Sequence, residues 1–346
     1  MGHASSPTMM RVSVLRAAGT VEVEERPVPR PGPGEVLVAI GSVGVCGSDV
    51  HYYEHGRIGP YVVDSPLVLG HEAGGTVAEV APDVASLSVG QRVSIEPGVP
   101  CRNCAQCLAG RYNLCPRIRF FATPPFDGAF AEYVVMPESF VHPIPDLLSD
   151  DAAGLLEPLS VGVWACRRAG VGPESRVLVT GAGPIGLIAA QAARAYGAAE
   201  VWITDVNPRR LAMASELGLT AIDVSSTPLA GAGVEADVLF ECSGNEQATR
   251  DAIRVVDRAG RVVLVGMGGD ELRLPLAHVQ DREITLTGAF RYANTWPTAI
   301  ALAASGRVDL NRLVTGHYGL DDVEHALTAA RRDPATLKVM VRPAEQ

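Results

Sequence analysis

Hydrophobic and polar residues follow different patterns in the two halves of the chain. Up to about residue 155, short apolar segments such as 35-EVLVAIGSVG-44 and 74-GGTVAEV-80 are separated by turns rich in Pro and Gly. Short strands with this regular punctuation predict a β-rich domain of sandwich or barrel type.

Beyond that point, apolar strands alternate with helical stretches. Such alternation, with helices of ~10–15 residues, predicts a parallel, doubly wound sheet, so the chain as a whole belongs to the α/β class. The predicted strands are 176–181, 200–205, 237–244, 261–266 and 284–288, and the predicted helices are 184–196, 208–218 and one from about 246. The tail predicts two further helices, at 296–305 and 321–332, and a last strand at 338–342.

Composition narrows the class of protein. The 346 residues suffice for two domains of ordinary size. The chain has 29 Lys and Arg against 39 Asp and Glu and no run of basic residues, which argues against nucleic acid or an anionic membrane as a partner. No apolar stretch reaches the ~18 residues of a membrane-spanning helix. The start, 1-MGHASSPTMM-10, lacks the pattern of a secretory signal. It is predicted to be a disordered leader or an expression remnant, and the expected location is the cytoplasm.

A G-x-G-x-x-G sequence joins the first strand of the second half to the helix that follows. Gly181 permits the tight turn, Gly183 lets a pyrophosphate approach the backbone, and Gly186 lets the helix pack closely on the strand. The helix begins at Pro184, and its N-terminus offers free N–H groups and a positive dipole end to phosphates. The pattern predicts a dinucleotide site.

An acidic residue ends the next strand, as this kind of site requires. The carboxylate of Asp205 is expected to accept hydrogen bonds from the ribose hydroxyls and to repel a 2′-phosphate, which favours NAD over NADP. Arg210 lies nearby and could stack on adenine, so NADP stays an alternative.

Cysteines are concentrated in one short segment. Of the seven cysteines, four occur as Cys101-x2-Cys104-x2-Cys107-x7-Cys115. Four thiolates satisfy a closed tetrahedral zinc site of structural type, with an iron–sulfur cluster as the rival. Cys166 and Cys242 fall in apolar segments and are expected to be buried small hydrophobes.

A second set of metal-ligand residue types lies earlier in the chain. Cys46 directly follows a strand, His71 and Glu72 occur in 69-LGHEAGG-75, and Glu157 could add an oxygen ligand. A catalytic zinc takes about three protein ligands and leaves a position for water or substrate. Together with a nicotinamide-binding fold, the set predicts a zinc-dependent dehydrogenase.

These motifs resemble those of the zinc-dependent medium-chain dehydrogenases and reductases. The signature G-H-E-x2-G-x5-[GA]-x2-V is met from Gly70 to Val84. Within that superfamily the chain is most similar to the sorbitol (L-iditol 2-) and xylitol dehydrogenase branch, through 122-ATPPFDG-128, 157-EPLSVG-162 and 290-FRYANTWP-297. The four-cysteine segment departs from the animal sorbitol dehydrogenases, which commonly lack it.

The resemblance implies a fold and a division into domains. It implies a GroES-like β-rich catalytic domain over residues 1–155 and 292–346, and a Rossmann domain that binds NAD over 156–291. It also implies a homotetramer.

The resemblance also assigns roles to individual residues. Catalytic zinc would be held by Cys46, His71 and Glu72, with Glu157 bound directly or through water, and Asp49 could orient His71. Ser48 would contact the substrate hydroxyl and His51 would continue a proton relay, although His51 could equally be a surface residue. The polyol pocket would be lined by Tyr52, Phe120, Arg291 and Tyr292, with Phe120 an ordinary core residue as the alternative. The NAD contacts would be Gly181, Gly183, Pro184, Ile185, Gly186, Asp205, Arg210, Val265, Gly266, Met267, Phe290 and Arg291.

The predicted reaction is the oxidation of a polyol to a ketose with hydride transfer to NAD. The alternatives are the same machinery acting on L-threonine, a sugar acid or a simple secondary alcohol, and a non-catalytic protein that binds zinc and a dinucleotide. Retention of every candidate metal ligand favours an enzyme.

Overall fold

The segment Glu35–Gly44 forms β3, the central strand of a largely antiparallel sheet. Most of its side chains are buried, as expected for a near-continuous apolar run covered on both faces. β3 pairs with β7, β11 and β20, and the sheet order is β12-β8-β7-β3-β20-β19. The other strands are β7 (Glu72–Val80), β8 (Arg92–Ile95), β11 (Tyr133–Pro137), β12 (Val141–Pro143), β19 (Val314–Tyr318) and β20 (Lys338–Val341).

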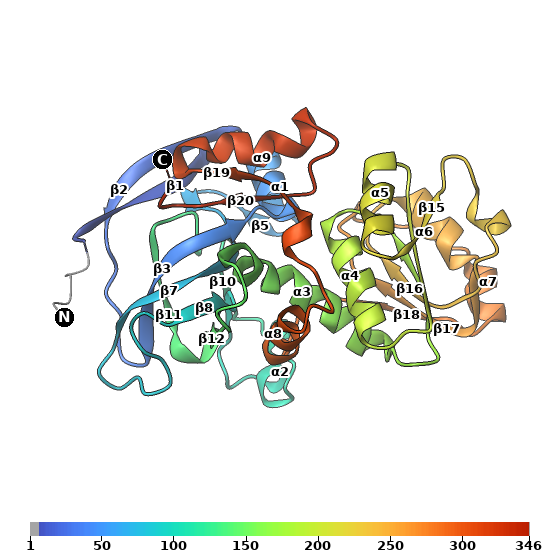
Figure 1. Cartoon of the computed structure of the whole chain (residues 1–346), viewed down its shortest axis with the longest axis horizontal. Coiled ribbons are helices and arrows are strands. Elements are labelled where there is room, and N and C mark those ends of the chain that lie inside the picture. Colours follow the sequence, from blue (N-terminus) through green and yellow to red (C-terminus); the bar gives the residue numbers. More distant parts are fainter. Residues whose placement is uncertain (1–6, 346) are drawn as a thin grey trace. The chain divides into compact units, whose positions relative to one another are not determined.

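Smaller elements complete this β-rich part (Figure 1). A second sheet has the order β2-β1-β6, and two short two-stranded sheets pair β4 with β5 and β9 with β10. These strands are β1 (Met9–Ala17), β2 (Thr20–Pro27), β4 (Arg57–Ile58), β5 (Tyr61–Val62), β6 (Leu67–Val68), β9 (Gly98–Val99) and β10 (Arg119–Phe120). The helices are α1 (Gly47–His55), α2 (Ala105–Leu108) and α9 (Val323–Arg332), with 3-10 turns at Tyr112–Leu114, Glu138–Phe140, Asn311–Leu313 and Leu320–Asp322.

The second half of the chain forms a parallel sheet in the order β15-β14-β13-β16-β17-β18. The order reverses direction between β13 and β16. Right-handed crossovers therefore place α4 and α5 on one face and α6 on the other, as Figure 1 shows. The strands are β13 (Arg176–Thr180), β14 (Glu200–Asp205), β15 (Thr220–Asp223), β16 (Ala236–Glu241), β17 (Val256–Leu264) and β18 (Thr285–Gly288). The helices are α4 (Pro184–Ala195), α5 (Pro208–Glu216), α6 (Glu246–Ile253), α7 (Leu276–Asp281) and α8 (Trp296–Ala304), with a 3-10 turn at Leu229–Gly231.

This computed structural model describes residues 7–345. The chain divides into two units: one runs to Glu157 and resumes at Leu310, and the other spans Pro158–Asp309. The α/β class, with a β-rich GroES-like part and a doubly wound parallel sheet, is confirmed.

The second boundary differs from the predicted division at residues 291 and 292. α8 belongs to the same unit as the parallel sheet. Arg167 holds it there, because its guanidinium donates to the carbonyl of Asn294, just before α8, at 2.7 Å and to Oγ1 of Thr298, within α8, at 2.9 Å. Gln191 of α4 also donates to the carbonyl of Asp309 and accepts from its amide.

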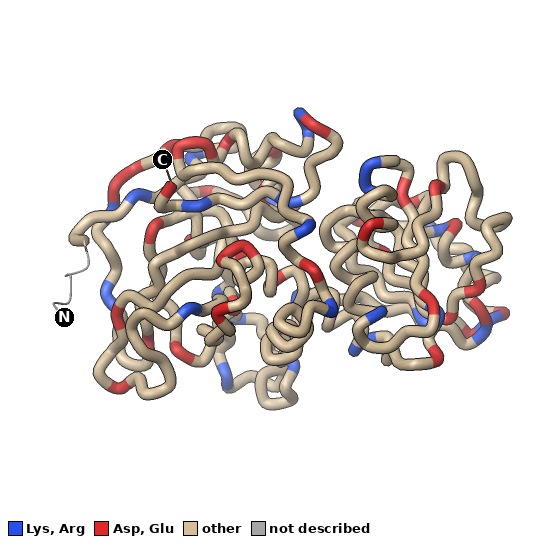
Figure 2. The backbone as a smooth tube through the Cα atoms, viewed as in Figure 1, with Lys and Arg blue, Asp and Glu red and all other residues tan. Residues whose placement is uncertain are grey.

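Two predictions need correction. The predicted leader, residues 1–10, overlaps β1, which begins at Met9 and pairs with β2; residues 1–6 lie outside the described part of the chain. The long helix α3 (Asp150–Ala169) was not predicted at all. Positions of acidic and basic residues are scattered along the backbone of each unit (Figure 2).

Candidate metal centres and dinucleotide site

Strand register brings together three side chains of metal-ligand type. Gly44 at the end of β3 pairs with Glu72 at the start of β7. Cys46 follows β3, and His71 immediately precedes β7. Their ligand atoms, one from each side chain, all lie within 4.8 Å of one another. Thiolate, imidazole and carboxylate together form a donor set suited to zinc.

The carboxylate of Glu72 occupies a space that only glycine leaves open. A Cβ on Gly44 would lie 2.0 Å from Oε2 of Glu72. Glu72 itself is completely buried. Buried carboxylates need compensating partners, and Nζ of Lys338 lies 2.8 Å from both carboxylate oxygens. Lys338 did not emerge from the sequence motifs.

Asp49 fixes the two loops that carry the ligands. Its Oδ2 accepts from the amide of Cys46 and its Oδ1 from the amide of Gly70, both at 2.9 Å. Oδ1 lies 3.8 Å from Nδ1 of His71, which is too long for a hydrogen bond. Asp49 therefore orients His71 mainly through the backbone rather than through the ring.

The charges around this group are strongly coupled. Burial by itself lowers the pKa of His71, but the nearby Cys46 thiolate and Asp49 raise the pKa well above its usual value. Burial likewise lowers the pKa of Lys338, and the charge of Glu72 outweighs it, so the net shift is upward. A buried group so rich in anionic donors fits a divalent cation.

The other predicted residues of this unit differ in burial and in the element that carries them. Glu157 is buried on α3 and lies outside the set of mutually close ligand atoms. Its charge nevertheless acts on Lys338. Ser48 is half-buried in the first turn of α1, whereas His51 is exposed, with its ring 4.6 Å from that of His55.

Two aromatic residues assigned to the substrate pocket are buried. The ring of Phe120 lies 5.7 Å from that of His71, so Phe120 borders the ligand group. Tyr52 is buried on α1. Arg291 and Tyr292 belong to the unit that contains the parallel sheet.

The four cysteines of the 101–115 segment converge as their spacing predicts. All four sulfurs lie within 4.8 Å of one another. The Sγ of Cys107 is 3.4 Å from that of Cys104 and 4.0 Å from that of Cys101. Zn–S bonds of about 2.3 Å in a tetrahedron place sulfurs about 3.8 Å apart. A polynuclear iron–sulfur cluster would hold them further apart because several irons lie between them. The geometry favours zinc.

Local contacts shift the pKa values of these thiols in opposite directions. The backbone amide of Asn103, together with the Arg117 guanidinium, lowers the pKa of the Cys101 thiol to about 6. Desolvation and neighbouring sulfurs raise the pKa of Cys107 to about 12, an effect that a bound cation would reverse. Outside this segment, Cys166 is fully buried as predicted, and Cys242 is only partly buried.

The glycine-rich loop has the geometry that a pyrophosphate site needs. Gly181 has φ +83°, and a Cβ on Gly186 would lie 1.8 Å from the carbonyl oxygen of Gly181. A Cβ on Gly183 would meet only Nη1 of Arg210, at 3.9 Å. The space above Gly183 is thus open and bordered by a cation, with Pro184 and Ile185 starting α4 beside it.

Asp205 ends β14 beside this loop. Its Oδ2 accepts from the amide of Ala182 at 2.8 Å, and its Oδ1 accepts from the amides of Val206 and Asn207. Nη1 of Arg210 lies 3.8 Å from Oδ2. The carboxylate is therefore held at the edge of the loop with its charge only loosely paired.

Two more turns meet at the same edge of the sheet. The amides of Val265 and Gly266 both donate to the carbonyl of Glu241 at 2.8 Å. A Cβ on Gly244 would lie 2.1 Å from the carbonyl oxygen of Met267, so the turns after β16 and β17 touch. Met267 is left exposed.

The last predicted contacts follow β18. Arg291 has φ +52°, and its guanidinium carbon lies 4.8 Å from the centre of the Phe290 ring. Phe290 is exposed, whereas Tyr292 is buried with its ring 5.3 Å from that of Trp296.

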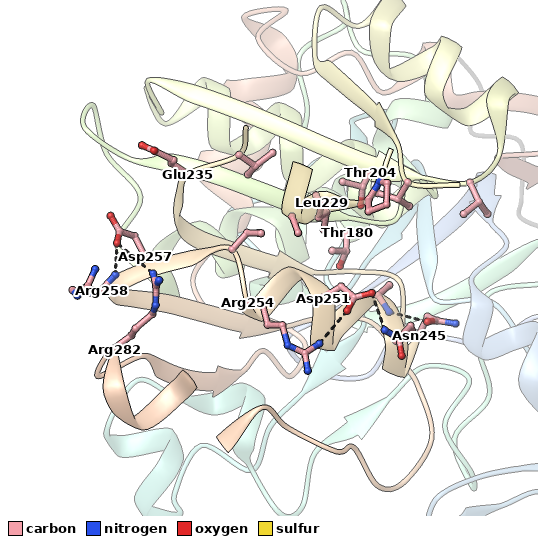
Figure 3. Close-up of a pocket in the computed structure, with 18 residues that line it drawn as sticks. Thr180, Thr204, Leu229, Glu235, Asn245, Asp251, Arg254, Asp257, Arg258 and Arg282 are labelled. Carbon is pink, nitrogen blue, oxygen red and sulfur yellow. Dashed lines mark hydrogen bonds and ion pairs between the residues drawn. The ribbon is translucent and has the colours of Figure 1, made fainter. Parts of the chain in front are cut away.

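A groove of about 880 Å³ runs along one face of the parallel sheet, between α6 and the segment after β15 (Figure 3). Thr180 and Thr204 line it at the carboxyl ends of β13 and β14, and Val206 follows Asp205. Among the described residues, those that line the groove include neither the glycine loop 181–186 nor Asp205, so the groove is distinct from the predicted pyrophosphate site. The other end of the groove is lined by charged residues such as Asp257 and Arg282, with oppositely charged atoms 3.6 Å apart.

Comparison with known proteins gives the same result along the whole chain. Residues 32–146 match the alcohol dehydrogenase GroES-like domain and residues 184–305 match the zinc-binding dehydrogenase family. The sorbitol dehydrogenase of Bacillus subtilis is 43% identical over 348 residues, covering 97% of this chain and 98% of that protein. That of Bos taurus is 43% identical over 338 residues, covering 95% of each chain.

A solved structure supports the fold directly. An Escherichia coli oxidoreductase of unknown specificity superimposes with a TM-score of 0.93 at 35% identity, covering 97% of this chain and 100% of that one. In residues 7–345, no helix has the length and apolarity to cross a membrane. The prediction of a zinc-dependent, NAD-linked oxidoreductase is confirmed at the level of the family. The chain belongs to the zinc-binding medium-chain dehydrogenases, and within them it resembles the sorbitol dehydrogenases.

Proposed function

We propose that this protein oxidises a polyol such as sorbitol, xylitol or L-iditol to the corresponding ketose, with NAD as hydride acceptor. The observation that carries the proposal is the complete group of Cys46, His71 and Glu72 in one unit, with an intact G-x-G-x-x-G loop and Asp205 in the other. A protein without catalytic activity would not need both the metal-ligand group and the dinucleotide loop. The sorbitol dehydrogenases to which the chain is 43% identical support the choice of substrate class.

Cys46, His71 and Glu72 would hold the catalytic zinc, and Glu157 would complete the set directly or through water. Zinc in such a site supplies Lewis acidity, which lowers the pKa of a coordinated hydroxyl. The protein contributes the fixed geometry: Asp49 braces the loops of Cys46 and His71 through two backbone hydrogen bonds.

The substrate proton would leave along α1. Ser48 and His51 stand three residues apart on this helix, so they share one face. Ser48 would accept the hydroxyl proton, and His51, being exposed, would pass it to solvent. The contact of His51 with the His55 ring extends this polar path.

Specificity for a polyol would come from Tyr52, Phe120, Arg291 and Tyr292. The Arg291 guanidinium offers a fixed fork of donors for neighbouring hydroxyls. Its positive φ and its contact with the Phe290 ring restrict where that fork can point.

NAD would occupy the parallel-sheet unit. The pyrophosphate would lie at Gly181, Gly183 and the start of α4, and the ribose at Asp205. Arg210, Val265, Gly266, Met267, Phe290 and Arg291 would complete the contacts. Asp205 disfavours the 2′-phosphate of NADP because the two groups carry like charge.

A direct assay tests the function. The purified protein is incubated with NAD and, separately, sorbitol, xylitol, L-iditol, 2-butanol or L-threonine, and NADH absorbance is followed with and without a chelator. Polyols should give the highest kcat/KM, and chelation should abolish turnover. A higher kcat/KM for L-threonine or 2-butanol would contradict the assignment of polyols as the substrate class. The absence of turnover on every substrate would favour a protein that only binds zinc and dinucleotide.

The proposal includes a homotetramer in the cytoplasm, which rests on the resemblance to polyol dehydrogenases. Light scattering of the purified protein gives the number of chains in the particle. A monomer would contradict the tetramer and leave the proposed chemistry untouched.

A further inference from the structure

Lysine occurs once in this chain. Every other cationic side chain of the Lys and Arg type, among 29 in total, is arginine. The one lysine, Lys338, is buried with 3% of its surface exposed. A buried ammonium is unfavourable unless it is paired, so its position calls for a physical reason.

Strand β3 places Lys338 beside the metal-ligand group. β7 pairs with one side of β3 and β20 with the other. Glu72 therefore approaches from β7 and Lys338 from β20, and the two meet beside Gly44, whose missing side chain leaves the room.

The Lys338 ammonium uses its three donor positions on three acceptors. It lies 2.8 Å from Oε1 and 2.8 Å from Oε2 of Glu72, and donates to the carbonyl of Val45 at 2.9 Å. Val45 directly precedes Cys46. A compact ammonium suits this arrangement better than a planar, longer guanidinium. One side chain thus binds one candidate ligand and the backbone next to another.

We propose that Lys338 is a positioning residue that competes with the catalytic metal for the carboxylate of Glu72. Because the ammonium binds both oxygens of Glu72, this carboxylate would be only a weak ligand of the metal. One coordination position of the metal would then stay open for the substrate hydroxyl. The inference rests on the proposed function, because the metal and its open position belong to it.

Removing the ammonium should therefore have opposite effects on binding and on turnover. In Lys338→Met, the freed carboxylate should bind the metal fully. Zinc affinity at this site should rise about tenfold and kcat for sorbitol should fall about tenfold or more, since changes next to metal ligands typically alter affinity or activity by ~10–100-fold. A side chain needed only for folding would lower both together.

The experiment measures metal binding apart from activity. Zinc affinity is determined by chelator competition on protein whose four-cysteine site stays occupied. The absorption spectrum of the cobalt-substituted protein reports the ligand geometry. Native protein is compared with Lys338→Met and with Lys338→Arg. The arginine keeps the charge but fits the buried space less well, so it should restore the native spectrum and kcat only in part. If Lys338→Met does not fold, the same measurements are made on Lys338→Gln.

A double-mutant comparison tests the interaction between Lys338 and Glu72 directly. Glu72→Gln removes the charge for which ammonium and metal compete, so adding Lys338→Met to it should change zinc affinity less than twofold. An unchanged or weaker zinc affinity in Lys338→Met, or a native cobalt spectrum, would overturn the inference. Because these measurements need no substrate, they remain decisive even if the protein proves not to oxidise polyols.

Discussion

The carboxylate of Asp205 accepts a hydrogen bond from the backbone amide of Ala182, at 2.8 Å. Asp205 is thus attached to the same glycine-rich loop that is expected to receive the pyrophosphate. Its second oxygen is engaged by the amides of Val206 and Asn207. The residue combines two roles: it holds the loop, and it presents a negative charge where the ribose would bind.

These roles predict different results for two substitutions. Asp205→Asn keeps a hydrogen-bond acceptor but removes the charge, and Asp205→Ala removes both. Either variant should narrow the preference for NAD over NADP by about tenfold, because one like-charge interaction is lost. Asp205→Ala should in addition weaken NAD binding, because the loop loses its support. The measurement is kcat/KM for both cofactors at fixed sorbitol. A native enzyme that uses both equally well would refute the role of the charge.

The two metal centres should respond differently to substitution. Metal analysis should find about two zinc ions per chain. Cys104→Ser should lower the melting temperature by several degrees with little effect on kcat, because a closed structural site contributes to folding and touches no substrate. Glu157→Ala should reduce kcat by ~10–100-fold with a small change in melting. The reverse pattern, or iron in place of zinc, would contradict the division of the sites.

Arg291 should distinguish polyols from plain alcohols. Loss of a charged hydrogen bond costs about 1.5–3 kcal/mol. Arg291→Leu should therefore lower kcat/KM for sorbitol, xylitol and ribitol by ~10–100-fold, and that for 2-butanol by much less. Arg291→Lys is the matched control: at this position of positive φ both variants carry a Cβ and a long side chain, so their difference reports the charged group. Equal loss on all four alcohols would remove the support for a polyol pocket.

A buried network in the β-rich unit should make stability depend on pH. Asp151 accepts from Ser42 at 2.7 Å, from Arg342 at 3.0 Å, and pairs with Nε2 of His317 at 2.7 Å. Burial alone raises the pKa of Asp151, but these partners outweigh it and lower the pKa below its ordinary value of 3.8. A carboxyl group whose pKa is lower in the folded state stabilises the protein above its unfolded pKa and loses that contribution as the pH falls through its folded pKa.

Comparing Asp151→Asn with native protein isolates this contribution. At pH 7 the variant should be less stable by about 1–3 kcal/mol, because the amide keeps one acceptor oxygen but loses the charge that pairs with the partly exposed Arg342 and His317. The difference in unfolding free energy should begin to shrink below about pH 4, where Asp151 becomes protonated in the unfolded chain. It should continue to shrink until the pH has fallen through the lower pKa of Asp151 in the folded protein. Urea titrations from pH 7 to pH 3 measure it. A difference that stays constant down to pH 3 would show that the charge of Asp151 is not what stabilises the fold.

Features built from residues close in sequence were predictable before the fold was known. The spacing of Cys101, Cys104, Cys107 and Cys115 led to a convergent sulfur group, because short turns leave few other arrangements. The glycine loop between β13 and α4 was identified for the same reason. Alternating strands and helices were likewise read correctly, since periodicity records which face is buried.

Helix α3 is an element that the sequence pattern did not predict. It carries Glu157 and contains both Gly154 and Pro158, which normally argue against a helix. Its first half is buried on all sides, so it lacks the polar face that would reveal a helical period. Tertiary packing decides that this segment is helical: a Cβ on Gly154, for example, would lie 2.7 Å from the carbonyl oxygen of Glu72 in β7.

Pairing between distant residues was decided by the tertiary structure alone. The sequence contains the signature around His71 and Glu72, and it contains a single lysine, but 266 positions separate that lysine from Glu72. They meet because β7 and β20 pair with opposite sides of β3 and because Gly44 leaves space between them. Local sequence determines which residues can act as metal ligands. Strand register, which is a property of the whole sheet, determines which charged side chains pair with those ligands.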